Sequence, residues 1–109
     1  MTAKEYLKQI KMIDTMLKNK AFEEKQLREL GISAEQVETE RRELQSKRES
    51  IIRTIEKLPE AEYDVLHKIY VQYETLYEVA ADRGISYSLA TTIHGRALKR
   101  LDDIIITVA

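Results

Sequence analysis

The chain of 109 residues contains no cysteine and no tryptophan, only one proline and only three glycines. The absence of cysteine excludes disulfide bonds and thiolate metal sites. Because proline and glycine interrupt helices, their scarcity predicts long helices with few breaks. The sequence also lacks a signal peptide and a long apolar run, so we expect a cytoplasmic protein that does not enter a membrane.

No group of residues indicates an enzyme. His67, on the third predicted helix, has no acidic or histidine partner at a spacing suited to a metal. No combination of Ser, His and Asp suggests a nucleophile with its base. We therefore expect neither catalysis nor a cofactor. His94, at the edge of an apolar helix face, is interpreted as a packed structural residue.

Charge is nearly balanced over the whole chain, with a net charge of −1, but it is divided unevenly. Residues 1–58 carry 13 basic and 11 acidic side chains, whereas residues 59–109 carry 5 basic and 8 acidic ones. The acidic second half argues against nucleic-acid binding, because that affinity rests largely on cations at phosphates. However, four basic residues and no acidic one lie from Arg83 to Arg100.

Helical periodicity in the first half predicts two long helices, at residues 3–30 and about 34–57. Gly31 stands where a helix C-cap is expected, and residues 33–36 have the pattern of a capping box. Two such helices joined by a short turn predict an antiparallel, coiled-coil-like hairpin over residues 1–58. We expect this hairpin to mediate oligomerisation, with a dimer favoured, through the apolar residues Ile10, Ile13, Leu17, Val37, Leu44 and Ile51.

The second predicted unit, residues 59–109, begins after Leu58. Pro59 is expected at the first position of a third helix, over about residues 60–72. The inner stripe of that helix is predicted to contain Leu66, Ile69, Tyr70 and Tyr73.

Two further helices are predicted after it. Residues 75–78 form a capping-box pattern that opens a short helix, and Gly84 ends that helix. Ser86 is a good N-cap for a last helix that reaches about Ile106. The predicted fold class is therefore all-α, a helical hairpin followed by a three-helix unit.

The last predicted helix has two unlike faces when residues are placed 100° apart. Its apolar side contains Ala90, Ile93, His94, Ala97, Leu98, Leu101, Ile104 and Ile105. Its other side contains Ser88, Thr92, Gly95, Arg96 and Lys99. Hydroxyls and cations can bond base edges and phosphates, and small residues permit close approach to DNA. The same cations could also be a solvated face near a helix end.

The stretch from Leu58 to Leu101 resembles the helix-turn-helix of sigma-70 region 4. Leu-Pro opens the first helix of that pattern, and Glu-Val-Ala at residues 78–80 precedes Gly-Ile-Ser at the turn. Arg-Ala-Leu at residues 96–98, with Leu101, closes the reading helix. Two positions depart from the pattern: Ala90 stands where valine is usual, and Arg83 replaces the common leucine before the turn glycine.

The N-terminal segment AKEYLKQIKMIDTMLKNK is similar to the start of small phage proteins of the ArpU- and RinA-like type. These late-transcription regulators join a helical N-terminal region to a sigma-like helix-turn-helix. The resemblance implies a phage or prophage transcriptional regulator that binds double-stranded DNA. The residues expected to face the groove are Ser88, Thr92, Gly95, Arg96 and Lys99, and those nearer phosphates are Thr75, Tyr87 and Arg100.

Two other functions fit the same sequence. A small-terminase-like DNA-packaging subunit also joins a helix-turn-helix to an oligomerising helical part, and a ring of subunits would favour it. A protein-interaction module could instead bind RNA polymerase or another regulator through the sigma-like surface. The acidic balance of residues 59–109 favours this second alternative.

Overall fold

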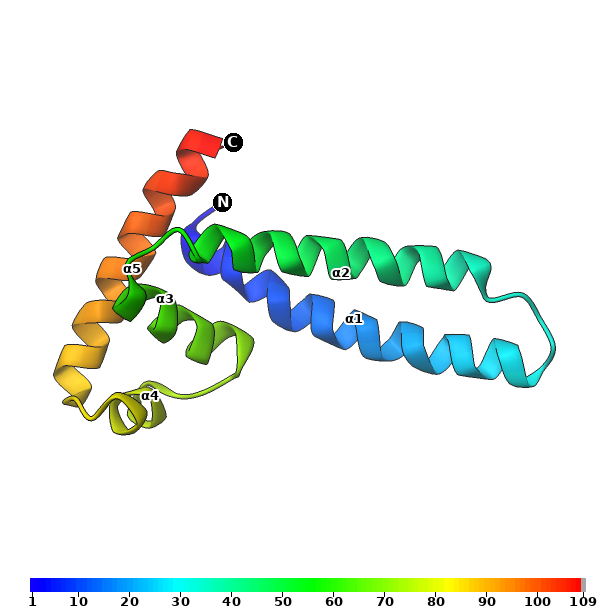
Figure 1. The fold of residues 1–109 in the computed structure, drawn as a ribbon, viewed down its shortest axis with the longest axis horizontal. Helices are drawn as coiled ribbons and strands as arrows, with labels where there is room; N and C mark the ends of the chain where they lie inside the picture. Colours follow the sequence, from blue (N-terminus) through cyan, green and yellow to red (C-terminus); the bar gives the residue numbers. More distant parts are fainter. Residues whose placement is uncertain (109) are drawn as a thin grey trace.

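The structure is a computed structural model that describes the backbone of residues 1–108 and the side chains of residues 1–106. Residue 109, the last of the predicted second unit, lies outside the described residues. All regular secondary structure of the described part is helical, which confirms the predicted all-α class. No helix of residues 1–108 is long and apolar enough to cross a membrane. The molecule measures 54 × 32 × 19 Å, and a long hairpin projects from a group of shorter helices (Figure 1).

The hairpin consists of α1 (Ala3–Glu29) and α2 (Glu35–Ile55), which run antiparallel (Figure 1). The hydroxyl of Thr2 caps α1 by accepting the backbone N–H of Glu5 at 3.2 Å. At the other end, Gly31 adopts a left-handed conformation with φ +69°. The Ile32 N–H then donates to the Leu27 carbonyl, so the orphan carbonyls of the last turn are satisfied. Leu30 is the C-cap, so Gly31 lies one residue after its predicted place and provides the left-handed turn there.

The predicted capping box at residues 33–36 does not form. Ala34, rather than Ser33, occupies the N-cap position of α2, with φ −101° and ψ 12° and no side-chain cap. The Ser33 hydroxyl accepts only the Glu35 N–H, at 3.4 Å, and the Gln36 amide donates to Glu40 instead. The prediction was wrong because the turn after Gly31 uses one more residue before the helix begins.

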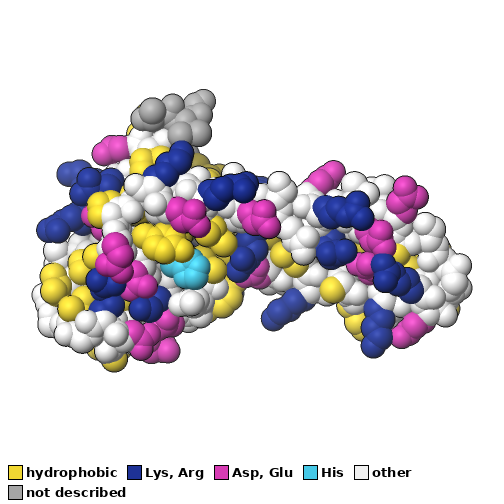
Figure 2. Space-filling view, viewed as in Figure 1, with side chains coloured by type: hydrophobic (Ala, Val, Ile, Leu, Met, Phe, Trp, Pro, Cys, Tyr) yellow, Lys and Arg dark blue, Asp and Glu magenta, His cyan; other side chains and the backbone are white. Residues whose placement is uncertain are grey.

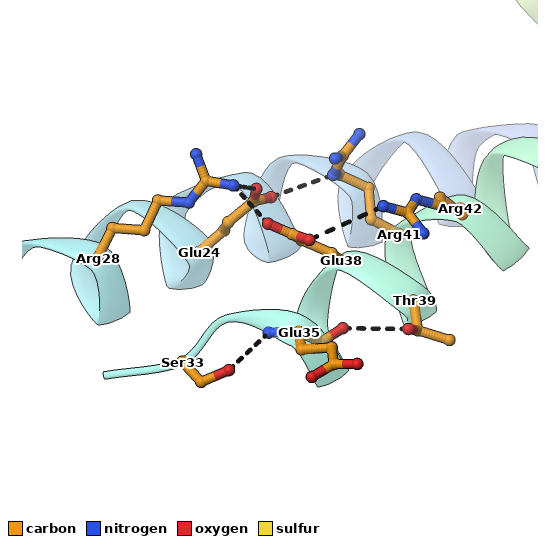
Figure 3. Close-up of polar contacts among 8 residues, drawn as sticks. All are labelled: Glu24, Arg28, Ser33, Glu35, Glu38, Thr39, Arg41 and Arg42. Atoms are coloured by element: carbon orange, nitrogen blue, oxygen red, sulfur yellow. Dashed lines mark hydrogen bonds and ion pairs between the residues drawn. The ribbon is translucent and has the colours of Figure 1, made fainter. Parts of the chain in front are cut away.

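Ion pairs replace apolar contacts in the outer part of the hairpin. Glu24 of α1 accepts from Arg28 at 2.7 Å and from Arg41 of α2 at 3.1 Å, and Glu38 pairs with Arg28 and Arg42 (Figure 3). Each such surface pair contributes about 0–1 kcal/mol. Together they connect the two helices where the sequence offers few apolar residues.

The third predicted helix is divided in two. Pro59 is the N-cap, one position before its predicted place, and α3 covers Glu60–Leu66. A π-helical turn, η1 (His67–Val71), follows, closed by the Gln72 N–H donating to the His67 carbonyl at 3.1 Å. The helix ends at Gln72, so Tyr73 lies in the loop that follows and not on the inner stripe as predicted. It is 50% exposed and has a left-handed backbone with φ +60°.

The last two helices are α4 (Leu76–Arg83) and α5 (Tyr87–Val108). Helix α5 packs against α3, α4 and the first part of α1. One hydrophobic core joins the base of the hairpin to the shorter helices, and it includes Leu7, Ile10, Ile51, Ile55, Leu66 and Leu101. The predicted boundary at residue 58 therefore lies beside a core that residues from both sides share.

The residues assigned to oligomerisation lie inside one chain. Ile10, Ile13, Val37 and Ile51 are buried, and Leu17 and Leu44 are half-buried against the same core. The four buried residues therefore stabilise the hairpin of one chain, whereas Leu17 and Leu44 keep some exposed surface. That these residues also mediate oligomerisation stays a prediction.

Candidate nucleic-acid interface

A capping box fixes the start of α4. The Thr75 hydroxyl accepts the Glu78 N–H at 3.2 Å, and the Glu78 carboxylate accepts the Thr75 N–H at 3.2 Å. The prediction of this cap is confirmed. Thr75 is exposed, but its hydroxyl is engaged with Glu78, so it is less available to a phosphate than the sequence suggested.

Gly84 forms the turn between α4 and α5. Its φ is +64°, a left-handed conformation that favours glycine, and nothing lies within 4 Å of where a Cβ would stand. The Ile85 N–H donates to the Ala80 carbonyl at 3.0 Å, and the Gly84 N–H donates to the Ala81 carbonyl at 3.2 Å. The Ser86 hydroxyl then accepts the Leu89 N–H at 3.0 Å, which confirms Ser86 as the cap of α5.

The two faces of α5 lie as the periodicity predicts. Ala90, Ala97 and Leu101 are completely buried, and Ile93, His94 and Leu98 are half-buried. The outward stripe is exposed throughout, and it consists of Ser88, Thr92, Gly95, Arg96 and Lys99. Ala90, where valine is usual in the sigma pattern, packs fully against the neighbouring helices, so the smaller side chain leaves no exposed gap there.

Three of the five cations of the second unit are held by acids of the same unit. Arg100 donates from Nε to the buried carboxylate of Glu62 at 2.8 Å, and Arg83 pairs with Asp64 at 2.7 Å. Lys68 also donates to Asp64, at 3.0 Å. Burial raises the pKa of Asp64, but the hydrogen bonds from the two cations outweigh it and hold this pKa below its ordinary value.

These pairs change the predicted role of Arg100. The side chain is exposed, but one edge of its guanidinium is committed to Glu62. Within the part of the chain that the structure describes, no ion pair reaches Arg96 or Lys99. In Figure 2, Lys and Arg side chains gather on the outer edge of the molecule where Figure 1 shows α5. The two unpaired cations of this unit therefore lie on the outward stripe.

An exposed aromatic pair stands beside the start of α5. The rings of Tyr77 and Tyr87 stack with centroids 4.3 Å apart and planes inclined by 17°. Tyr77 is 70% exposed and Tyr87 is 44% exposed, and the nearby Leu89 is exposed as well. The sequence suggested Tyr87 as a phosphate contact but did not suggest Tyr77. The two residues belong to different helices, so no periodicity within one helix could pair them.

His94 is packed on the inner side of α5, as predicted. Its Nε2 lies 2.9 Å from the Tyr70 hydroxyl, and the two rings stack with centroids 5.8 Å apart. Burial lowers the pKa of His94, and the positive charge of Lys4 lowers this pKa further. His94 therefore serves the contact between α5 and η1 and is not part of the outward stripe.

The described residues contain no group of three acidic or histidine side chains arranged to hold a metal ion. Comparison of the chain with protein-family models, with curated proteins and with solved structures gives no match. A proposal of function therefore rests on the geometry and chemistry of the α4–α5 unit.

Proposed function

We propose that this protein binds double-stranded DNA through the outward stripe of α5 and acts as a transcriptional regulator of the phage or prophage type. The observation that carries the proposal is the contrast between the two sides of α5. One side is buried against α3 and α4, whereas the small, hydroxylated and basic residues of the other side are all exposed. A helix held in this way by a tight turn suits the major groove.

The side chains of the stripe differ in what they offer DNA. Arg96 can donate two hydrogen bonds to a guanine edge, and Lys99 can pair with a phosphate. The Thr92 hydroxyl donates to the Ser88 carbonyl at 3.0 Å, and its lone pairs remain able to accept from a base. At Gly95, nothing lies within 4 Å of the position that a Cβ would take, so the helix can approach the base edges closely there. Tyr87, exposed at the start of α5, would contact a phosphate.

Oligomerisation would double these contacts, since a symmetric dimer binds two half-sites. Most of the hairpin seam is buried within one chain, so a dimer of this regulator would use the half-buried Leu17 and Leu44 or surfaces outside the seam. Light scattering with mass determination distinguishes the possibilities. A dimer agrees with a regulator on a two-fold operator, whereas a ring of many subunits would favour a DNA-packaging role.

The proposal is tested by two substitutions on α5. We expect Arg96→Ala to lose about 1–3 kcal/mol of binding on a preferred duplex selected from random sequences, and less on other duplexes. We expect Lys99→Ala to weaken binding to all duplexes alike and to reduce the salt slope by about one. Arg53→Ala and Lys47→Ala remove matched, exposed cations from α2 and serve as controls. If the α5 variants bind as the controls do, this stripe is not the reading surface.

A second candidate is a protein-interaction module that contacts RNA polymerase or another regulator. It is favoured by the acidic balance of residues 59–109 and by the exposed Tyr77–Tyr87 pair, since aromatic residues are enriched at protein interfaces. Low salt strengthens any electrostatic binding to DNA. A protein that binds no duplex at low salt, but binds purified RNA polymerase and loses that binding on Tyr77→Ser, would support this candidate instead.

A further inference from the structure

Lysines recur every seven residues along α1, at Lys4, Lys11, Lys18 and Lys25, with Lys8 beside the first two. Seven residues turn an α-helix to about 20° short of two full turns and advance it by about 10.5 Å. The four lysines therefore form a nearly straight row, about 32 Å long, on one side of α1. We call these five residues the lysine row.

Among the described residues, no ion pair holds the side chains of the lysine row. All five side chains are exposed, and no residue of the described chain forms an ion pair with any of them. The other cations of α1 behave differently, because Lys20 pairs with Glu40 and Arg28 pairs with Glu24 and Glu38. The row is therefore a positive surface that is not used to hold the hairpin together.

Asp14 lies between Lys11 and Lys18 along α1, and its carboxylate is engaged by other groups. Asp14 accepts from Arg48 of α2 at 2.7 Å and from the hydroxyl of Tyr73. Burial of the phenol, together with its hydrogen bond to Asp14, raises the pKa of Tyr73 to about 12. Lys11 and Lys18 line the same cleft, of about 570 Å³, without pairing with Asp14.

The lysine row starts next to α5 and runs away from it. Lys4 is near enough to His94 of α5 for its charge to act on that imidazole, and the neighbouring Ala3 N–H donates to Asp102 of α5 at 2.6 Å. In the view of Figures 1 and 2, α1 forms the lower edge of the hairpin, and Lys and Arg side chains project from that edge. The row therefore begins beside α5 and follows the hairpin away from it.

We propose that the lysine row binds the sugar-phosphate backbone of double-stranded DNA and extends the site on α5. The inference rests on the proposed function. The row would supply the phosphate-binding cations of which the outward stripe of α5 has only a few. Only Arg96 and Lys99 are unpaired cations among the described residues of the second unit, whereas DNA affinity rises with each phosphate that a cation neutralises. The row spans about 32 Å, close to the roughly 34 Å of one turn of B-DNA, so a single duplex can meet all of it.

An anionic membrane is the other large polyanion that lysines can meet. A helix that lies on a membrane inserts its apolar face between the lipids. The apolar face of α1, with Leu7, Ile10 and Ile13, is buried against α2 and the common core. With that face occupied inside the chain, α1 has only its charges to offer a membrane, whereas a duplex that meets the row can also meet α5, so we commit to DNA as the partner.

The experiment compares two double variants of the full chain. Lys11→Gln with Lys18→Gln removes two charges from the row, and Lys47→Gln with Arg53→Gln removes two exposed charges from α2. Glutamine is a good helix former, so both variants should keep the wild-type melting temperature in circular dichroism. Binding to a 30-base-pair duplex is measured by fluorescence anisotropy over a series of salt concentrations.

We expect the row variant to reduce the slope of log K against log salt by about 1.8 and to weaken binding by roughly 10- to 60-fold at 0.1 M salt. The α2 variant should keep the wild-type slope. Equal slopes for the two variants would overturn the inference. Loss of binding to phosphatidylserine vesicles in the row variant, with DNA binding unchanged, would overturn it in favour of a membrane.

The two proposals can fail separately. If Arg96→Ala weakens specific binding while the row variant behaves as the α2 control, the site on α5 stands and the row is rejected. If the row variant reduces the slope of log K against log salt while Arg96→Ala binds as wild type, the row binds DNA and α5 does not read its sequence. If the wild type binds no duplex at low salt, both are rejected.

Discussion

The backbone N–H of Ala3 donates a hydrogen bond of 2.6 Å to Oδ1 of Asp102, and so connects the first turn of α1 to α5. The N–H groups of a first helical turn have no partner within the helix, and a carboxylate there is favoured by the helix dipole. Thr2 satisfies the Glu5 N–H of the same turn. The contact therefore adds a polar link to the apolar core that holds the hairpin against the α4–α5 unit.

Asp102→Ala should lower the free energy of unfolding by about 1–2 kcal/mol, because it removes both the hydrogen bond and the charge at the N-terminus of α1. Asp102→Asn keeps an acceptor and removes only the charge, so its loss should be smaller. Urea unfolding followed by circular dichroism measures both. Wild-type stability of the alanine variant would mean that the contact contributes nothing in solution.

The buried seam of the hairpin predicts a second stability effect. Ile51 is 2% exposed between α1 and α2, so Ile51→Ala should cost about 2–5 kcal/mol. Met12 of α1 is 66% exposed, and Met12→Ala serves as the control with little expected change. Thermal melting gives the stabilities, and light scattering should show the same molar mass for both variants. If Ile51→Ala changes the molar mass without lowering the melting temperature, Ile51 contributes to an interface between copies of the chain.

Features governed by a few neighbouring residues could be predicted from the sequence. The turn at Gly84 follows from the need for a left-handed residue after a helix, and the caps at Thr75 and Ser86 follow from hydroxyls placed before a helix. The exposed stripe of α5 follows from its periodicity. Each of these features depends only on residues within a few positions along the chain, so the local sequence is enough to predict it.

Other features depend on contacts between distant segments. The π-turn η1 closes the third helix at Gln72, so Tyr73 lies in a loop and not on the inner stripe where periodicity placed it. The pairing of Arg100 with Glu62 joins residues 38 positions apart, and no pattern along α5 indicates it. Ser33 shows the limit of local motifs as well, because the path of the chain after Gly31 decided which residue became the cap.

The packing of His94 predicts a dependence of stability on pH. Burial and the charge of Lys4 hold its folded-state pKa below the ordinary value of 6.5. Between these two values the unfolded chain binds more protons than the folded chain, so stability rises with pH. The stabilisation is complete well above pH 6.5 and is lost as the pH falls toward the folded-state pKa. His67, whose pKa is lowered by burial and by Arg48, acts in the same direction.

We therefore expect the melting temperature to fall between pH 7.5 and pH 5.5, and His94→Gln to reduce that fall. Glutamine can still accept from the Tyr70 hydroxyl but does not titrate in this range. The carboxylates contribute equally to the pH dependence of the wild type and of each variant, so the difference between the two curves is due to the substituted histidine. His67→Gln measures the contribution of the second imidazole to the fall in melting temperature. An identical pH profile for wild type and His94→Gln would show that His94 titrates alike in the folded and unfolded chains.

Substitutions at Gly95 are expected to affect stability and DNA binding in different ways. An interior glycine costs a helix about 0.8–1 kcal/mol relative to alanine, and a Cβ at this position would meet nothing within 4 Å. Gly95→Ala and Gly95→Gln should therefore both raise the melting temperature. If α5 enters the groove, the long glutamine side chain should hold the helix away from the base edges and weaken binding to the preferred duplex by about 1–3 kcal/mol, while alanine changes binding little. A glutamine variant that is more stable and binds this duplex as tightly as the wild type would show that the glycine does not serve close approach, and would count against α5 as the reading helix.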